Sequence, residues 1–163
     1  MQADEHWALD ETTGAALPLP DGWARVAAPL GATVAIALTA WHPAPGIADC
    51  LPNIVLTTQP AGPNPDLLRL GTEAITQALL SADNAHVLAY DVWAASDDRP
   101  EGRHLCFAYQ QGDLGIYVSQ FVFVAGGALT AVTGTCGADV ADVLTPVFDA
   151  AGAGVRLPYG AAA

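Results

Sequence analysis

The sequence predicts an α+β fold in which two main helices pack against a single antiparallel β-sheet of about seven strands, in the order βββαββββα. Three observations support this. Apolar runs in residues 103–136 are separated by two glycine turns, Gly112-Asp113 and Gly126-Gly127. Glycine adopts positive φ without steric penalty, so these turns indicate antiparallel hairpins. Apolar residues at helical spacing precede and follow this region, at 65–81 and 138–151.

The first three strands are expected at residues 23–29, 33–41 and 53–59, which are rich in β-branched and other apolar residues. Leu30-Gly31 separates the first two strands, and the proline-interrupted segment 42–51 separates the second from the third. We therefore expect three consecutive strands, joined by loops, before the first helix.

The first helix is expected to begin at Asn64-Pro65-Asp66. Asparagine is a capping residue, proline is favoured at the first helical position, and a carboxylate interacts favourably with the positive end of the helix dipole. Apolar residues then follow at helical spacing to about Ser81, namely Leu68, Gly71, Ile75, Ala78 and Leu79. These residues form one stripe along the helix, and this stripe should be buried.

Four further strands are expected at residues 86–95, 103–111, 114–124 and 128–135. Pairing outward from the glycine turns sets their register. It places Gln111 opposite Leu114, Phe107 opposite Val118, Val124 opposite Leu129 and Phe121 opposite Val132. Both faces of the resulting sheet are largely apolar, so each needs a cover.

The second helix is expected over residues 138–151, where apolar side chains recur at i, i+3, i+4, i+7 and i+8. These are Val140, Val143, Leu144, Val147 and Phe148. Pro146 inside this segment predicts a kink or a late start, because proline cannot donate the helical hydrogen bond.

The cysteines are expected to be reduced. Their odd number, three, and wide spacing favour free thiols in a reducing compartment. The predicted register places Cys106 opposite Ser119 and Cys136 opposite Tyr117, about two strand spacings apart, or ~9.5 Å. A disulfide tolerates Cα separations only up to about 7 Å, so these two cysteines should not be bridged.

The domain organisation is expected to be simple, because 163 residues suit one domain with one core. Residues 1–20 are interpreted as a loosely ordered N-terminal lead-in that ends in a proline-rich segment. The domain itself is expected over 21–158, followed by a short C-terminal tail at 159–163.

The charge of the chain disfavours several classes of partner. Seventeen acidic residues against five basic ones, all arginine, give a net charge of −12. Nucleic acids and anionic membranes should therefore be repelled. The N-terminus lacks the basic and apolar regions of a signal peptide, and no apolar run reaches the ~18 residues of a membrane span. A cytoplasmic location without membrane insertion is the resulting expectation.

Several short sequence segments, together with this order of strands and helices, indicate a known family. The entry segment reads LPLPDGWARV, the third strand reads PNIVLTTQP, and the last strand closes in TGTC before the second helix. Over residues 17–157 the chain resembles the PsbP-like superfamily, which includes the Ran-binding Mog proteins. Within it, the chain is most similar to LpqN- and DcrB-type bacterial lipoproteins and to Eag-type effector chaperones.

The resemblance implies an antiparallel sheet with packed helices, and an activity of binding other proteins without chemistry. The chain lacks the signal peptide and lipobox cysteine of the lipoprotein members, which favours the cytoplasmic chaperone branch. We therefore expect a non-enzymatic adaptor or chaperone for a secreted or assembled bacterial partner. A second copy of this chain is an alternative partner, and no cofactor is expected.

The candidate partner-binding residues lie on one face of the predicted sheet. Two helices of modest length cannot easily cover both faces of seven strands, so one apolar face should remain open for a partner. The candidates are Tyr117, Phe121, Phe123, His104 and Val132. Phe107, on the opposite face, is assigned to the core. The competing interpretation is that a helix packs on the first face.

Two alternative functions remain open. One is a carrier that holds a small apolar ligand under the sheet. The other is a thiol enzyme using Cys136, which lies at the start of the second helix, where the dipole favours a thiolate. No catalytic motif accompanies this cysteine, and the spacing of His42, Asp49 and Cys50 matches no common zinc pattern. Neither a catalytic nor a metal site is therefore predicted.

Overall fold

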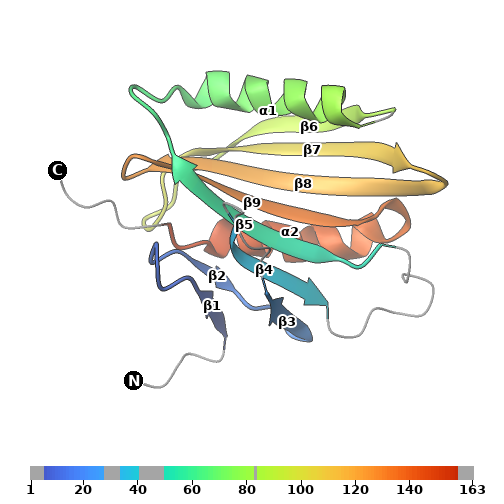
Figure 1. The fold of residues 1–163 in the computed structure, drawn as a ribbon, viewed down its shortest axis with the longest axis horizontal. Helices are drawn as coiled ribbons and strands as arrows, with labels where there is room; N and C mark the ends of the chain where they lie inside the picture. The colour runs from blue at the N-terminus through green and yellow to red at the C-terminus, as the bar shows by residue number, and fades with distance from the viewer. Residues whose placement is uncertain (1–5, 28–33, 41–49, 83, 158–163) are drawn as a thin grey trace.

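A computed structural model describes residues 6–27, 34–40, 50–82 and 84–157 of the chain. A seven-stranded antiparallel sheet and two helices form most of the structure, and a separate two-stranded sheet lies beside them (Figure 1). The predicted α+β class and the predicted order of strands and helices are confirmed.

The elements of the structure occur in the following order. They are β1 (Trp7–Leu9), β2 (Ala16–Pro18), β3 (Trp23–Val26), β4 (Val34–Ala40), β5 (Asn53–Pro60), α1 (Leu67–Ser81), β6 (His86–Trp93), β7 (Gly102–Gln111), β8 (Leu114–Ala125), β9 (Ala128–Gly137), a 3-10 turn (Ala138–Val140) and α2 (Ala141–Gly154). The large sheet has the strand order β3-β4-β5-β9-β8-β7-β6. The outer ends predicted for the first two strands, at 28–29, 33 and 41, lie outside the described residues.

The register predicted from the glycine turns is confirmed. The structure pairs Gln111 with Leu114, Phe107 with Val118, Val124 with Leu129 and Phe121 with Val132. Gly112, Gly126 and Gly127 have φ values of 61°, 56° and 75°, the conformation that these turns require. Cys106 lies opposite Ser119 and Cys136 opposite Tyr117, and all three cysteines are free thiols.

Both helices begin slightly later than predicted. The N-cap of α1 is Asp66, whose Oδ1 accepts a hydrogen bond of 3.0 Å from the backbone N–H of Leu68. Asn64 instead adopts a left-handed conformation with φ of 51°, outside the helix. Aspartate caps helices as well as asparagine does, so Asp66 can be the N-cap in place of Asn64. The helix α2 begins at Ala141, after a 3-10 turn, and Pro146 lies inside it, so the proline does not set the start of the helix.

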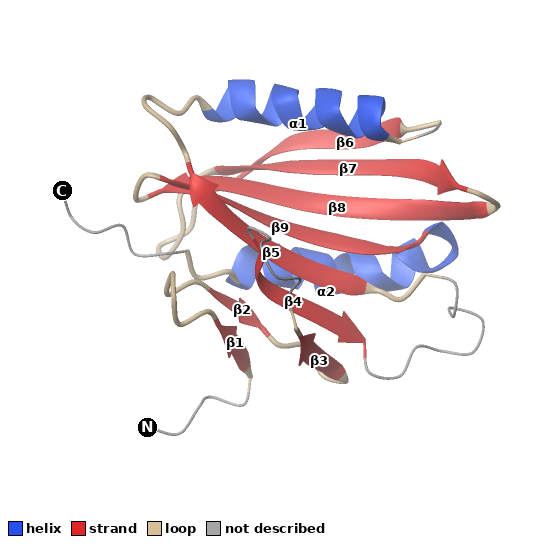
Figure 2. Ribbon diagram, in the orientation of Figure 1, coloured by secondary structure: helices blue, strands red, loops and turns tan. Residues whose placement is uncertain are grey.

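The two helices lie on opposite faces of the sheet (Figure 2). In Figure 2, α2 runs behind β9 and β5, whereas α1 lies along the edge formed by β6 and contacts β6, β7 and β8. The core lies between α2, the sheet and the N-terminal hairpin. Its fully buried large side chains are Leu17, Ile36, Leu38, Ile54, Leu56, Phe121, Phe123, Val132 and Phe148.

The N-terminal segment is more ordered than the expected lead-in. Over residues 7–18 it forms the β1–β2 hairpin, and Leu17 within it is fully buried. Backbone hydrogen bonds of 2.9 Å in both directions join Ala16 to Arg156, next to the end of α2. Burial of this apolar strand against α2 explains the difference, because it contributes to the same core as the large sheet.

Candidate functional site

The sheet face expected to meet a partner is the core of the protein. Phe121, Phe123 and Val132 are fully buried and Tyr117 is almost so, which corrects the expectation that this face is open. The cause is α2, which packs closely on this face at two glycines, Gly134 in β9 and Gly152 in α2. A Cβ at Gly152 would lie 2.5 Å from Cγ of Phe121, so the helix approaches because a side chain is missing there.

The opposite face is the more exposed of the two. Phe107, which the sequence assigns to the core, is half-buried there and stacks at 6.2 Å on Tyr109. The assignments of Phe107 and Phe121 are therefore reversed. The helix α1 covers this face only over β6 to β8, which leaves β9, β5 and β4 without a helix in front of them (Figure 1).

His104 belongs to a polar cluster on the sheet face that α2 covers. Its Nε2 lies 2.8 Å from Oγ of Ser119 and 3.2 Å from Sγ of Cys106. The hydroxyl of Tyr117 donates a hydrogen bond of 3.2 Å to the same sulfur. Burial lowers the pKa of His104, while nearby Asp149 and Asp91 act in the opposite direction. Because these groups satisfy one another inside the core, we interpret the cluster as structural.

Cys136 has the electrostatic character of an inert thiol. It is fully buried, and burial, assisted by Cys50 and Asp139, raises its pKa to about 12. A thiolate would therefore be scarce at neutral pH, which disfavours the thiol-enzyme alternative. His42 and Asp49 lie outside the described residues. Within the described residues, no group of three or more potential metal ligands is brought together.

Exposed apolar side chains gather on α1 and on β6, the outermost strand of the sheet. We call this surface the α1/β6 edge, and it comprises Leu68, Leu79, Leu80, Val87, Leu88 and Val92. Leu80 is 81% exposed and Leu88 58% exposed. Leu79 and Leu80 lie at the end of α1 and Val87 and Leu88 at the start of β6, and these two segment ends are on the same side of the molecule (Figure 1).

The sequence gives only a partial signal for this surface. Leu80 lies outside the stripe predicted to be buried, which is consistent with its exposure. The prediction is wrong for Leu68 and Leu79, which belong to that stripe and are 58% and 46% exposed. Leu88 occupies a β-bulge between Val87 and Ala89, and a bulge of this kind cannot be located from apolar alternation alone.

A cleft of about 760 Å³ opens at the end of the sheet where the chain reverses between β6 and β7. We call it the arginine cleft, because Arg99 and Arg156 line it together with Trp7, the 96–100 loop, the Ala125-Gly126 turn and residues 153–157. The sequence shows the 96–101 segment only as a charged loop. Its proximity to Arg156 depends on the tertiary fold.

Among the described residues, no helix is long and apolar enough to cross a membrane.

Comparison with known proteins finds similarity in structure. No protein-family model and no curated protein sequence matches the chain. LpqN, involved in cell envelope biogenesis of Mycobacterium tuberculosis, is similar at a TM-score of 0.68 and 13% identity over 88% of this chain and 83% of LpqN. CyanoP, the cyanobacterial PsbP of Synechocystis sp. PCC 6803, is similar at a TM-score of 0.66 and 14% identity over 93% of this chain and 91% of CyanoP. A Pseudomonas aeruginosa protein of unknown function is similar at a TM-score of 0.54 and 11% identity over 88% of this chain and 92% of that protein.

Proposed function

We propose that this chain, which has the PsbP-like fold expected from its sequence, is a non-enzymatic module that binds another protein through its α1/β6 edge. Its role would be that of an adaptor or chaperone for a secreted or assembled partner. The observation that carries the proposal is the exposure of six large apolar side chains on one helix and the adjoining outer strand. Contiguous exposed apolar patches in water are typical of protein contact sites.

The exposed residues include two pairs on either side of one turn. Leu79 and Leu80 close α1, and Val87 and Leu88 open β6. Only six residues separate Leu80 from Val87 in the sequence, and α1 contacts β6. An apolar segment of a partner could therefore contact both pairs at once, and a buried leucine contributes about 1.5–3 kcal/mol.

The net charge of the chain favours a different protein over a second copy. Two copies would each bring a net charge of −12, and like charges oppose association. On α1 the exposed ion pair between Arg69 and Glu73 is internally neutral. We therefore infer a partner that offers apolar side chains flanked by basic residues.

Contact through side chains fits this edge better than addition of a strand. The bulge between Val87 and Ala89 interrupts the regular ladder of β6. Bulges in outer strands hinder pairing with another strand. Affinity would then come from the leucines and valines rather than from backbone hydrogen bonds.

Free thiols support a proposal about location. All three cysteines are free, including Cys106 on β7 and Cys136 on β9, the two strands that flank β8. Reduced cysteines are typical of the cytoplasm. We therefore propose that the module works there, in agreement with the location expected from the sequence.

A paired substitution tests the α1/β6 edge. Leu80→Asp combined with Leu88→Asp places two charges on exposed positions and should leave the free energy of unfolding within about 1 kcal/mol of the wild type. The matched control is Val143→Asp on α2, 68% exposed and on the other face of the sheet. Partners crosslinked to the wild type in native extract would be purified, and their affinity measured by calorimetry for all three proteins.

The proposal requires one specific pattern. A purified basic partner should bind the wild type and the Val143→Asp control equally, and should bind the double variant at least ten-fold more weakly. Equal affinity for all three proteins would contradict the assignment of this surface. Sedimentation velocity distinguishes the other occupant, because a wild-type dimer lost in the double variant would identify a second copy.

A further inference from the structure

We propose that the arginine cleft binds a ligand with a carboxylate group and an apolar body, and that Arg99 and Arg156 hold the carboxylate. This inference concerns a different part of the molecule from the α1/β6 edge and does not depend on the proposed function.

Arg99 is a buried cation without a counter-ion. It is only 7% exposed, and no described carboxylate lies within 4 Å of its guanidinium. Of its five N–H donors, one bonds to Ala94 O at 2.9 Å and another to Pro100 O at 3.3 Å. Its Nε is buried and has no hydrogen-bond acceptor among the described residues. A buried charge without a counter-ion is costly, so binding of an anion by Arg99 would be favourable.

Aromatic rings hold the Arg99 guanidinium in position. Its Cζ lies 4.9 Å from the ring centre of Phe123 and 5.9 Å from that of Trp93. Contacts with aromatic faces restrict a guanidinium without using its N–H groups. The remaining donors are therefore fixed in place at the wall of the cleft.

Arg156 is a second cation without a counter-ion in the same cleft. Its Cζ lies 3.8 Å above the ring centre of Trp7, and its side chain has no hydrogen bond or ion pair with the described residues. Outside the cleft, Arg69 pairs with Glu73 and Arg103 pairs with Glu101. Arg25, also outside the cleft, is exposed and donates a hydrogen bond of 2.7 Å to Leu9 O, so Arg99 is the described arginine that is buried without a carboxylate partner.

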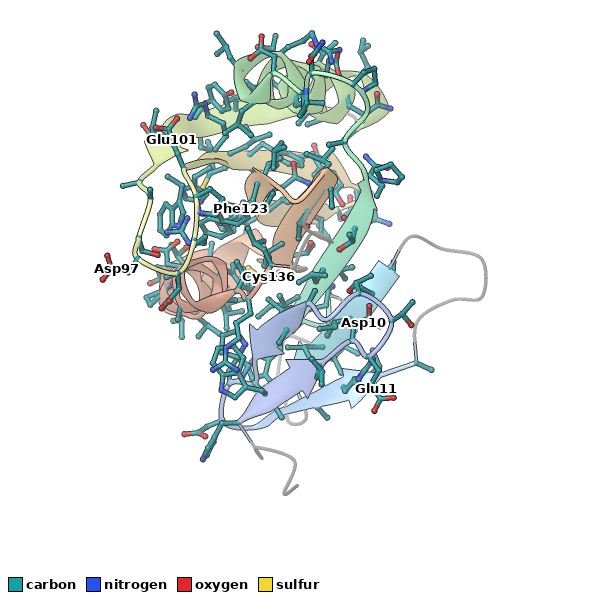
Figure 3. All side chains as sticks on the ribbon, turned by 90° about the vertical axis from the view of Figure 1, so that its left-hand side faces the viewer. Asp10, Glu11, Asp97, Glu101, Phe123 and Cys136 are labelled. Carbon is teal, nitrogen blue, oxygen red and sulfur yellow. The ribbon has the colours of Figure 1, made fainter. Side chains whose placement is uncertain are left out.

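The nearby aspartates limit the kind of anion. Asp97 and Asp98 lie in the same loop as Arg99, but neither forms an ion pair with a described arginine. Figure 3 shows the Asp97 side chain pointing outward, away from Phe123. Their negative charges, with the net charge of −12, repel a dianion more strongly than a monoanion. A carboxylate is therefore favoured over a phosphate.

The remaining lining specifies an apolar body. Pro100, Val155 and Leu157 line the cleft together with the ring of Trp7. A volume of about 760 Å³ is that of a site for a small organic molecule or a few residues of a peptide. Planar, bidentate recognition by arginine then fixes the carboxylate end.

Titration with benzoate tests the site. Benzoate carries a carboxylate on an apolar ring, and benzamide is its neutral analogue. In 1H–15N spectra of the full chain at constant ionic strength, benzoate should shift the Nε–H signals of Arg99 and Trp7. Benzamide should bind at least ten-fold more weakly, because it cannot replace the charge-assisted hydrogen bonds.

Two variants give the control. Arg156→Gln should weaken benzoate binding at least ten-fold while leaving the fold intact, because Arg156 is exposed and makes no side-chain hydrogen bond to a described residue. Arg69→Gln removes the same charge outside the cleft and should leave the affinity unchanged. The proposal is overturned if benzoate causes no shift up to about 20 mM, if benzamide binds equally, or if both variants lose affinity to the same extent.

A dipeptide distinguishes the two sources of a carboxylate. N-acetyl-Ala-Phe with a free carboxylate represents a peptide C-terminus, and its C-terminal amide is the control. Binding of the free acid at least ten-fold tighter than benzoate assigns the cleft to peptide C-termini, whereas benzoate binding as tightly as the dipeptide assigns it to small organic acids. Both results support the proposed carboxylate chemistry.

Discussion

The ring of Phe121 occupies the space that a side chain at Gly152 would need, since a Cβ at Gly152 would lie 2.5 Å from Cγ of Phe121. The two residues come from β8 and α2 and join the sheet to the helix that covers it. Close approach of helix and sheet at this point keeps Phe121 completely buried.

Substitution of Gly152 by alanine should destabilise the protein by roughly 1–3 kcal/mol, despite the better helix propensity of alanine, because the added methyl group overpacks the core. Urea denaturation measures the change in the free energy of unfolding. Gly71→Ala on α1 is the comparison. There the nearest atom is the hydroxyl end of Tyr90, a half-buried side chain that can move, so the loss should be smaller. A stabilised Gly152→Ala variant would contradict the close packing.

Truncation of two phenylalanines should show which sheet face is the core. Phe121→Ala removes a fully buried ring and should lower the free energy of unfolding by about 3–5 kcal/mol. Phe107→Ala removes a half-buried ring on the other face and should lower it by roughly half as much. Denaturation midpoints of both variants check the order. A larger loss for Phe107→Ala would restore the assignment expected from the sequence.

Protonation of His104 should weaken the fold. Burial lowers its pKa in the folded state below the ordinary value of 6.5, so the unfolded chain binds more protons between these two values. The contribution of the neutral imidazole is therefore fully present above about pH 6.5 and is lost as the pH falls through the folded pKa. Denaturation at pH 7.5, 6.5 and 5.5 should show a decline that His104→Gln reduces. Equal pH dependence in both proteins would exclude this histidine as the cause.

Native thiol labelling should spare Cys136. Burial raises its pKa from the ordinary 9.0 to about 12, so its thiolate is scarce at pH 8. Iodoacetamide should therefore react first with the partly exposed Cys50, and Cys50→Ser should remain almost unlabelled until it is unfolded. Peptide mass spectrometry reports each site. Rapid native labelling of Cys136 would favour the thiol-enzyme alternative.

The meander of residues 102–137 is predictable because each of its turns contains glycine at a position that needs positive φ. Once Gly112 and Gly126 are placed, every pair along β7, β8 and β9 follows from the two-residue period of a strand. The same reasoning predicts both helices from apolar spacing and places their ends within a few residues.

The covered face is not predictable from this pattern, because both faces of the meander are apolar. A signal is nevertheless present, since Gly134 lies on the same face as Phe121 and contacts the ring of Phe148 from α2. A glycine in a strand indicates close approach by another element. The arginine cleft leaves no such signal, because only the tertiary fold brings Arg99 near Arg156.

The position of β5 beside β9 has a consequence for how the chain folds. The strands β3 to β5 pair with their neighbours in sequence, and so do β6 to β9, but the ladder from Asn53 with Thr135 to Pro60 with Ala128 joins segments separated by α1 and three strands. Closing so long a loop costs more conformational entropy than forming any hairpin of the sheet. We expect the pairing of β5 with β9 to form last and to limit the folding rate. Until it forms, β9 would be an outer strand of the partly folded sheet.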